Sequence, residues 1–365
     1  MQPKPIRVLL VDDSPLALAV LRQMLVTSPD LEVVGAATGG LEALEMIPAL
    51  QPTVICADYH MRGMNGLEFT RQVMARFPRP ILVVSSAVGA NDTDRVFALL
   101  EAGAVDVFPK PRGGRDTDAQ SAELFVKKVK IVAGVWVRGR LPRETVPATR
   151  SARPALPPPI PPTRAMQIVV MGASTGGPQA LQTILSQLPR RFPLPILCVQ
   201  HISSGFLGGL VSWLGAHFAG KVQIARIGEI PAPGHVYFPP ENSHLVIDRG
   251  GRLQASSAPA YEGHRPSVNV TFLSAAAHYG DAAIGVLLTG MGRDGGDGMA
   301  ALAQAGAWTI AQDEASCVIF GMPGDAVERG AARAVLPLTE IARALIAAAE
   351  LAPHAFGEKN PYGNQ

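Results

Sequence analysis

Short apolar runs alternate with stretches of helical periodicity, and this alternation limits the possible folds more than any other feature of the sequence. The first five apolar runs are IRVLLV, EVVGAA, TVICA, ILVVS and AVDVF. Apolar residues recur at helical spacing in the stretches between them, which are residues 15–26, 41–47, 67–77 and 94–101. Repeated strand–helix units predict a parallel sheet with helices on both faces. We therefore expect an N-terminal (βα)5 domain over residues 5–130.

A segment rich in proline and arginine, residues 137–165, interrupts the alternation. It has no period of 2 or 3.6, which predicts a linker. The alternation then resumes with QIVVMGA, PILCVQ, AAIGVLLTG and AWTIAQ. These runs predict a second domain over residues 166–350, a doubly wound and mainly parallel α/β fold, in which residues 234–254 form an antiparallel hairpin. The polar residues 352–365 predict a flexible tail.

Composition excludes several classes of protein. The chain has 32 Lys and Arg against 30 Asp and Glu, a balance that gives no basic face for nucleic acid. No apolar run approaches the roughly 18 residues of a membrane span, and the N-terminal run is too short for a signal peptide. The three cysteines lie far apart in apolar segments, which is typical of reduced core residues. We expect a cytoplasmic protein that does not insert into membranes.

Charged and polar residues follow four of the five strands predicted in the first domain. Asp12 and Asp13 follow the first strand, Asp58 the third, Ser85 the fourth and Lys110 the fifth. The carboxyl ends of parallel strands meet at one edge, so these side chains should lie together. Crowded carboxylates favour a hard divalent cation such as Mg²⁺, and a carboxylate can accept a phosphoryl group. Ser85 and Lys110 would then hold the phosphoryl oxygens.

These residues make the chain resemble the receiver domain of bacterial response regulators over residues 5–130. The resemblance implies that Asp58 is phosphorylated by a histidine kinase. It also implies that Mg²⁺ is bound by Asp12, Asp13 and Asp58, and that a cis peptide precedes Pro111.

Three residues follow apolar strands of the second domain: Ser174 after IVVMGA, His201 after PILCVQ and Asp294 after IGVLLTGMGR. The glycine-rich turn at Ser174 fits either a dinucleotide site or a nucleophilic serine. A dinucleotide site needs glycine where Ser174 stands, because a β-carbon there would crowd the pyrophosphate. An α/β-hydrolase would place its acid before its histidine in the chain. We predict that Ser174 is a nucleophile, that His201 is its base and that Asp294 orients the histidine.

Residues 166–347 resemble the catalytic domain of the chemotaxis protein-glutamate methylesterases, on the segments GASTGGPQAL, QHISSGF, RPSVNVTF, LLTGMGRDGGDGM and TIAQDEASCVIFGMP. The resemblance implies that this Ser–His–Asp triad hydrolyses glutamate γ-methyl esters on methyl-accepting chemoreceptors and deamidates glutamines, without a cofactor. It implies that the Met291 N–H binds the oxyanion and that Thr175 supports His201. It also implies that the receiver domain controls the esterase.

Two other classes of protein fit these residues less well. A docking protein with an inactive catalytic fold would not need all three triad residues. A DNA-binding regulator would need a helix-turn-helix and a basic face after the linker, and neither is apparent in the sequence.

The sequence departs from both family patterns at a few positions. In MRGMNG, Arg62 and Asn65 replace the usual proline and aspartate, which affects the turn after Asp58. Asn269 stands where an aspartate is common, and residues 203–204 are serines where prolines or small residues are usual. We expect the last two departures to touch the substrate groove and to affect receptor preference.

Overall fold

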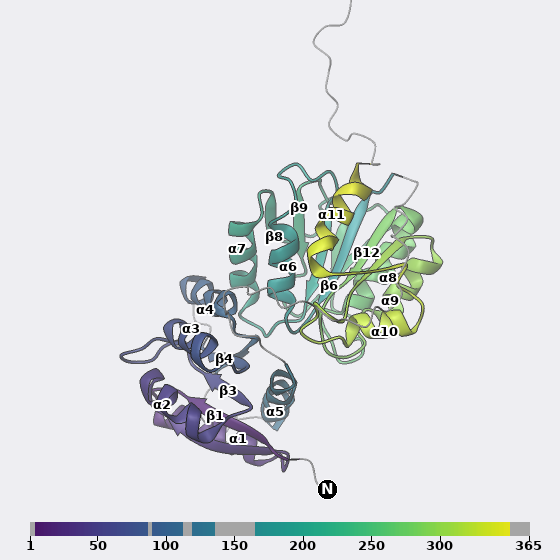
Figure 1. Ribbon diagram of the computed structural model, residues 1–365. Coiled ribbons are helices and arrows are strands. Elements are labelled where there is room, and N and C mark those ends of the chain that lie inside the picture. The colour runs from purple at the N-terminus through teal and green to yellow at the C-terminus, as the bar shows by residue number, and fades with distance from the viewer. Residues whose placement is uncertain (1–3, 87–89, 112–118, 136–164, 351–365) are drawn as a thin grey trace, which may run out of the picture. The chain divides into compact units, whose positions relative to one another are not determined.

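The structure is a computed structural model that describes residues 4–86, 90–111, 119–135 and 165–350 (Figure 1). It divides into two compact units, and the first and second units contain the first and second sheets respectively. The predicted tail and all but the last residue of the predicted linker lie outside the described residues. The predicted domain boundaries therefore stay predictions.

The first unit contains a five-stranded parallel sheet of order β2-β1-β3-β4-β5. Its strands are β1 (Ile6–Val11), β2 (Leu31–Ala37), β3 (Val54–Ala57), β4 (Ile81–Ser85) and β5 (Asp106–Pro109). The central strands β3 and β4 are buried along their whole length, as expected of a sheet covered on both faces. This is the predicted (βα)5 fold.

The five helices of the first unit are α1 (Pro15–Val26), α2 (Gly40–Leu50), α3 (Gly66–Arg76), α4 (Ala90–Ala102) and α5 (Ala119–Ala133). Four of the five helices overlap the predicted stretches, and the fifth, α5, had no predicted bounds. Ser14 caps α1 through a hydrogen bond to the Ala17 N–H, and Pro15 occupies its first turn. The cis peptide expected before Pro111 is not found. The one cis bond among the described residues is Arg265–Pro266. X-Pro bonds favour trans by only about 0.5–1 kcal/mol, so the local sequence decides the isomer weakly.

The second unit contains a seven-stranded sheet of order β14-β13-β12-β6-β7-β9-β8, and every neighbouring pair is parallel. Its strands are β6 (Ile168–Ala173), β7 (Ile196–Gln200), β8 (Lys221–Ile224), β9 (His235–Phe238), β12 (Ala283–Leu287), β13 (Trp308–Gln312) and β14 (Ala334–Leu336). The strand order reverses at β6, which lies between β7 and β12. Open α/β sheets bind ligands beyond the carboxyl end of such a strand.

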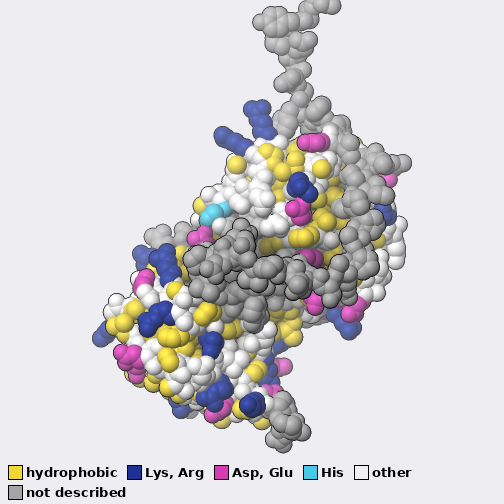
Figure 2. Space-filling model, viewed as in Figure 1, with side chains coloured by type: hydrophobic (Ala, Val, Ile, Leu, Met, Phe, Trp, Pro, Cys, Tyr) yellow, Lys and Arg dark blue, Asp and Glu magenta, His cyan; other side chains and the backbone are white. Residues whose placement is uncertain are grey.

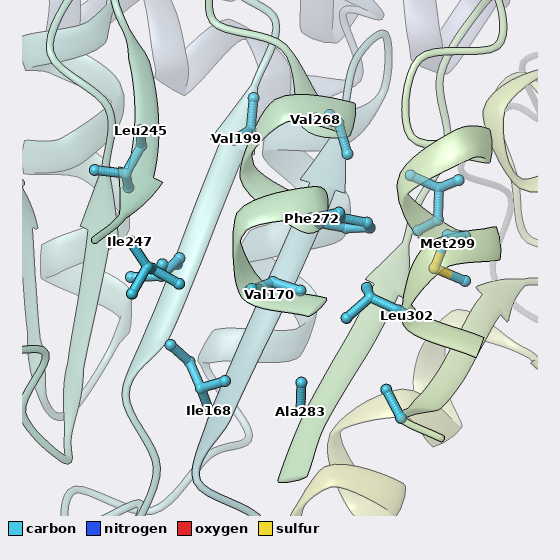
Figure 3. Close-up of a cluster of buried hydrophobic side chains, with 14 of the residues drawn as sticks. Ile168, Val170, Val199, Leu245, Ile247, Val268, Phe272, Ala283, Met299 and Leu302 are labelled. Carbon is cyan, nitrogen blue, oxygen red and sulfur yellow. The ribbon is translucent and has the colours of Figure 1, made fainter. Parts of the chain in front are cut away.

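Helices cover both faces of this sheet. They are α6 (Gly177–Leu185), α8 (Val268–Tyr279), α9 (Gly296–Gln304), α10 (Met322–Glu328) and α11 (Leu338–Ala349). A further helix, α7 (Leu207–His217), is divided between the two units, because residues 202–213 group with the first. Helices α6 and α11 pack together on one face, and α8 and α9 pack together on the other (Figure 1). Figure 3 shows Ile168 and Val170 of β6 in one buried cluster with Phe272 of α8 and with Met299 and Leu302 of α9.

The hairpin prediction for residues 234–254 is correct only for its second part. Strands β10 (His244–Ile247) and β11 (Leu253–Ser256) form an antiparallel pair. Residues 235–238 instead form β9, which joins the large sheet between β7 and β8. The run of Pro239 and Pro240 removes two backbone donors and separates these strands. The short strands β8 and β14 were not predicted from the sequence.

The formal net charge of the chain is only +2 at pH 7. On the face seen in Figure 2, basic and acidic side chains are interspersed with apolar ones. This agrees with the balanced composition. No helix that could span a membrane is found within the part of the chain that the structure describes.

Candidate active site and phosphoacceptor pocket

Two carboxylates and an ammonium group meet at the carboxyl edge of the first sheet. The Lys110 Nζ lies 2.7 Å from Asp12 Oδ2 and 2.7 Å from Asp58 Oδ2. Both aspartates are buried, because they directly follow the buried strands β1 and β3. The Tyr59 N–H donates to Asp58 Oδ1 at 2.6 Å, which orients the carboxylate of the predicted phosphoacceptor.

Burial and charge act against each other in this pocket. Burial raises the pKa of Asp12 above its ordinary value, and the Lys110 ammonium and the Ser14 N–H offset only part of that effect. Burial also lowers the pKa of Lys110, but hydrogen bonds to Asp12 and Asp58 outweigh it and leave that pKa raised. The pocket therefore holds two acids against one firmly protonated lysine.

Ser85 and Asp13, the other predicted pocket residues, are placed less tightly. Ser85 ends β4, and its Oγ is buried without a hydrogen-bond partner among the described residues. Asp13 is half-buried next to Asp12. No group of three His, Cys, Asp or Glu side chains that could hold a metal ion is found within the described ranges. The Mg²⁺ ligand set stays a prediction.

The turn after Asp58 keeps its form despite the changed residues. Asn65 caps α3 because its Oδ1 accepts a hydrogen bond from the Glu68 N–H at 2.9 Å, as an aspartate would. Gly66 lies against the Asp58 backbone, where an added Cβ would be 2.5 Å from the Asp58 carbonyl oxygen. Positive φ at Gly63 makes the turn itself.

In the second unit, Ser174 and His201 directly follow the neighbouring strands β6 and β7. Ala173 and Gln200 are opposite each other at the ends of these strands, and the His201 N–H donates to the Ala173 carbonyl at 3.0 Å. Ser174 follows β6 at the point where the strand order reverses. The structure thus places the predicted nucleophile and the predicted base on adjacent strand ends, as the sequence indicated.

Asp294 lies beside His201. The His201 Nε2 is 2.8 Å from Asp294 Oδ2. The other ring nitrogen of His201, Nδ1, is buried and has no hydrogen-bond partner among the described residues. In the chymotrypsin arrangement the acid holds Nδ1 and the base is Nε2, so the two nitrogens have exchanged places here.

The N-terminus of α8 holds the Asp294 carboxylate. Its oxygens accept hydrogen bonds from the Val268 N–H at 2.8 Å, the Asn269 N–H at 2.9 Å and the Ser267 hydroxyl at 2.8 Å. Burial raises the pKa of Asp294, but the bond and charge of His201, with these N–H donors, outweigh it and leave that pKa below its ordinary value. Asp294 is therefore ionised at neutral pH.

Asn269 does not touch a substrate groove, contrary to the expectation from the sequence. It is fully buried on α8, and its Oδ1 accepts hydrogen bonds from the Gly295 N–H at 2.9 Å and the Gly298 N–H at 2.8 Å. Both donors follow Asp294 in the chain. Asn269 thus braces the loop that carries the acid, a role that the single sequence did not reveal.

A second serine contacts Asp294, and a second histidine contacts that serine. Ser267, His244 and Asp294 form a buried network whose composition is also consistent with a triad. Its connections differ, however. His244 Nδ1 accepts from the Ser267 backbone N–H at 3.1 Å, and its Nε2 lies 3.2 Å from the Pro259 carbonyl. The Ser267 hydroxyl caps α8 and is fully buried.

The loop that contains Met291 passes close to Ser174. An added Cβ on Gly290 would lie 2.7 Å from the Ser174 Cβ, so this approach requires glycine. Met291 is 41% exposed, and its N–H donates to no other group within the described part of the chain. Thr175 is buried, and its carbonyl accepts from the Thr289 hydroxyl at 3.0 Å. The predicted support of His201 by Thr175 stays a prediction.

One histidine that the sequence did not single out lies against the site. The His264 ring stacks on the His201 ring, with centroids 4.1 Å apart and planes 1° from parallel. A short bridge between Tyr261 and His264 holds this loop, and the Tyr261 hydroxyl donates to Asp297 Oδ2 at 2.8 Å. Sixty-three positions separate the two histidines in the chain, so no local pattern could pair them.

Comparison with known proteins agrees with both units. A family model described as CheB methylesterase matches residues 169–345, and one described as response regulator receiver domain matches residues 8–119. The protein-glutamate methylesterase/protein-glutamine glutaminase 4 of Geobacter metallireducens is 43% identical over 93% of this chain and 98% of its own length. The corresponding protein of Nitrosospira multiformis is 42% identical over 93% of this chain and 96% of its own length.

A solved structure is similar to the second unit. The crystal structure of the Thermotoga maritima CheB methylesterase catalytic domain is 39% identical, with a TM-score of 0.49, and the match covers 50% of this chain and 98% of that one. The relatives match across both units at about 40% identity or more. The chain belongs to the CheB family of protein-glutamate methylesterases/protein-glutamine glutaminases that carry an N-terminal response regulator receiver domain.

Proposed function

We propose that Ser174, His201 and Asp294 hydrolyse glutamate γ-methyl esters and glutamine side-chain amides on chemoreceptor helices. One observation carries this assignment. His201 is held to Asp294 through Nε2, while its Nδ1 is buried without a partner among the described residues, at the strand end next to Ser174. An unpaired basic nitrogen beside a serine can take the proton of that serine.

The reaction has two halves. Ser174 Oγ attacks the ester carbonyl while its proton passes to His201 Nδ1, and the Met291 N–H donates to the developing oxyanion. The tetrahedral intermediate collapses, the acyl–oxygen bond breaks and His201 returns the proton to the leaving methoxide, which departs as methanol. His201 then removes a proton from water, which attacks the acyl-serine. Collapse of the second intermediate breaks the bond between the acyl carbon and Ser174 Oγ, and His201 returns the proton to Oγ, which releases the glutamate carboxylate and restores Ser174.

Asp294 makes the transfers possible by remaining ionised. Its lowered pKa keeps a negative charge next to Nε2, where it fixes the tautomer and stabilises the imidazolium that forms in each half-reaction. The same residues act on a glutamine amide, where the leaving group is ammonia. An amide leaves only when protonated, so this reaction depends more strongly on His201 as an acid.

The receiver unit controls this activity through Asp58. A carboxylate next to a firmly protonated lysine suits phosphoryl transfer from a histidine kinase, since Lys110 can bind the transferred oxygens together with Ser85. The convergence of Asp12 and Asp58 oxygens on one cation fits an oxygen-ligated ion, so Asp12, Asp13 and Asp58 would hold Mg²⁺. Bound there, Mg²⁺ would neutralise charge on the transferred phosphoryl group.

The partners follow from this assignment. The substrates are the cytoplasmic helices of methyl-accepting chemoreceptors, and the phosphodonor is the histidine kinase of the same signalling pathway. We place the protein in the cytoplasm, where both partners are accessible.

Methanol release from methylated receptor membranes distinguishes Ser174 from Ser267 as the nucleophile. We expect Ser174→Ala to abolish release, because no nucleophile remains. Ser267→Ala should retain release to within about tenfold, because it removes a helix cap and one of several bonds to Asp294. The reverse result would reassign the nucleophile to Ser267.

A further inference from the structure

The side-chain amide of Gln200 connects the two strand ends that carry the nucleophile and the base. Gln200 is the last residue of β7 and is 3% exposed. Its Nε2 donates to the Ser174 carbonyl at 2.8 Å and to the His201 carbonyl at 2.8 Å. One amide nitrogen thus uses both of its hydrogens to join the backbone of the two residues.

We propose that Gln200 is a positioning residue that sets the distance and angle between Ser174 and His201, and so determines the rate of the chemical step. This inference rests on the proposed function, because it concerns the same nucleophile and base. Gln200 itself acts only through their backbone carbonyls.

The chemistry of the contacts fixes which way the amide faces. Both partners are carbonyl oxygens, which only accept, so the NH₂ group must face them. The Ser174 carbonyl accepts a second hydrogen bond, from the Gly177 N–H at 2.8 Å. These bonds hold the peptide plane after Ser174 and therefore the direction of its side chain.

The opposite strand end is held at the same time. The His201 N–H donates to the Ala173 carbonyl, and the His201 carbonyl accepts from Gln200. The peptide groups on both sides of His201 are thereby linked to the backbone that carries Ser174. Asp294 holds the far edge of the imidazole, so the ring is fixed at its backbone and at Nε2. Misplacement of such a pair by about 1 Å can lower a rate roughly 100-fold.

The structure shows a second adaptation to this amide at Gly177. An added Cβ at that position would lie 2.0 Å from Gln200 Oε1, far inside van der Waals contact. Glycine at the first position of α6 therefore makes the space that Gln200 occupies. A side chain at residue 177 would push the amide away from both carbonyls without altering Gln200 itself.

Two substitutions separate hydrogen bonding from packing. Gln200→Met keeps the length and bulk of the side chain but removes both donors. Gln200→Glu keeps the shape, yet its ionised form only accepts, so it faces two carbonyl oxygens without a donor. A residue needed only for packing would tolerate Met, which keeps the bulk of the side chain without burying a charge. We expect both variants to release methanol with a kcat below that of the wild type.

The test is steady-state methanol release by the full chain, with active sites counted by a serine-directed phosphonofluoridate. Counting sites removes any effect of unfolded protein. We expect Gln200→Met to lower kcat per labelled site roughly 10- to 100-fold, with KM within twofold of the wild type, because binding groups are untouched. If Gln200→Met yields too little folded protein, Gly177→Ala should show the same lowered kcat with a nearly unchanged KM.

Gln254→Met is the control, since it removes another amide donor, to Asp248, in the β10–β11 hairpin, from a hydrogen bond that involves none of Ser174, His201 and Asp294. It should leave kcat and KM unchanged. A kcat per site within twofold of the wild type in Gln200→Met, full activity in Gln200→Glu, or a loss confined to KM would overturn the role of Gln200. Activity in Ser174→Ala would overturn the triad itself and this role with it.

Discussion

At the scale of single residues, the ionised state of Asp294 is the feature on which the proposed chemistry depends. In Asp294→Asn the amide can still bond to His201, but it brings no charge and favours the wrong tautomer. We expect kcat for methanol release to fall by up to about 10⁴-fold, as in serine proteases. Unchanged Ser174 labelling stoichiometry would serve as the folding control. A loss of kcat smaller than about threefold would mean that Asp294 only stabilises its loop.

The same residue predicts a dependence of stability on pH. The pKa of Asp294 is lowered in the folded protein, so its ionisation stabilises the fold above the ordinary value of 3.8. That contribution is lost as the pH falls through the folded pKa, which lies below 3.8. The difference in unfolding free energy between wild type and Asp294→Asn should therefore shrink as the pH falls below 3.8. Chemical denaturation on both sides of this pH measures it, and a difference independent of pH would contradict the lowered pKa.

The pKa of Asp12 is shifted in the opposite direction, so its charge has the opposite effect on stability. Its pKa is raised by burial, so the charged form destabilises the folded first unit at neutral pH, and that penalty disappears as the pH falls through the raised pKa. We expect Asp12→Asn to raise the unfolding temperature of this unit, by about 4–8 °C per kcal/mol gained, while it impairs phosphorylation. Calorimetry of the full chain tests this. A lowered temperature would mean that the ion pair with Lys110 outweighs the burial of the charge.

At the scale of elements, helix caps connect the sequence to the sites. Asn65 caps α3 directly after the phosphoacceptor turn, and the usual family residue at that position is aspartate. We expect Asn65→Ala to destabilise the first unit by about 1 kcal/mol and Asn65→Asp to leave its stability nearly unchanged. Urea denaturation gives both values. Equal losses in the two variants would show that the side-chain oxygen is not the cap.

The local sequence pattern predicted the helices and strands that position residues within a single strand–helix unit. Pro15–Val26 was predicted with its observed bounds, because a serine cap and a proline mark its start and its apolar face has a clear period. The strand ends at Ser174, His201 and Asp58 followed from the same alternation. Short edge strands such as β8 were missed, since four half-exposed residues carry little periodicity.

Contacts made between distant segments could not be predicted from one sequence. The stack of His264 on His201, the brace of Asn269 on the Asp294 loop and the amide bridge of Gln200 each join different elements. Gln200 did have a local signal, because it is a polar residue at the end of an otherwise apolar strand, directly before the predicted base. Buried polar groups need hydrogen-bond partners, so a polar residue at this position predicts contacts with neighbouring segments.

At the scale of the whole molecule, a phosphorylation site and a hydrolytic site are parts of one chain. Coupling free energies of about 1–3 kcal/mol between sites correspond to a 5- to 150-fold change. We expect a small acyl phosphate with Mg²⁺ to raise methanol release by the full chain within this range, and Asp58→Asn to stay at the basal rate. Stimulation of Asp58→Asn would mean that the phosphodonor acts elsewhere.

The direction of control can be measured separately. If the unphosphorylated receiver unit inhibits the esterase, removal of residues 1–140 should raise basal methanol release and abolish the response to phosphodonor. If instead the phosphorylated receiver assists catalysis or receptor binding, the shortened chain should be no faster than the unphosphorylated full chain.

The most direct test of the account is to trap the acyl-enzyme. Rapid mixing of the full chain with a methylated receptor fragment, acid quenching and peptide mass spectrometry would locate the covalent bond. The mechanism predicts an adduct of receptor fragment and enzyme, lighter by one methanol, on the peptide that contains Ser174, and no adduct in Ser174→Ala. An adduct on Ser267, or methanol release by Ser174→Ala at the wild-type rate, would contradict it.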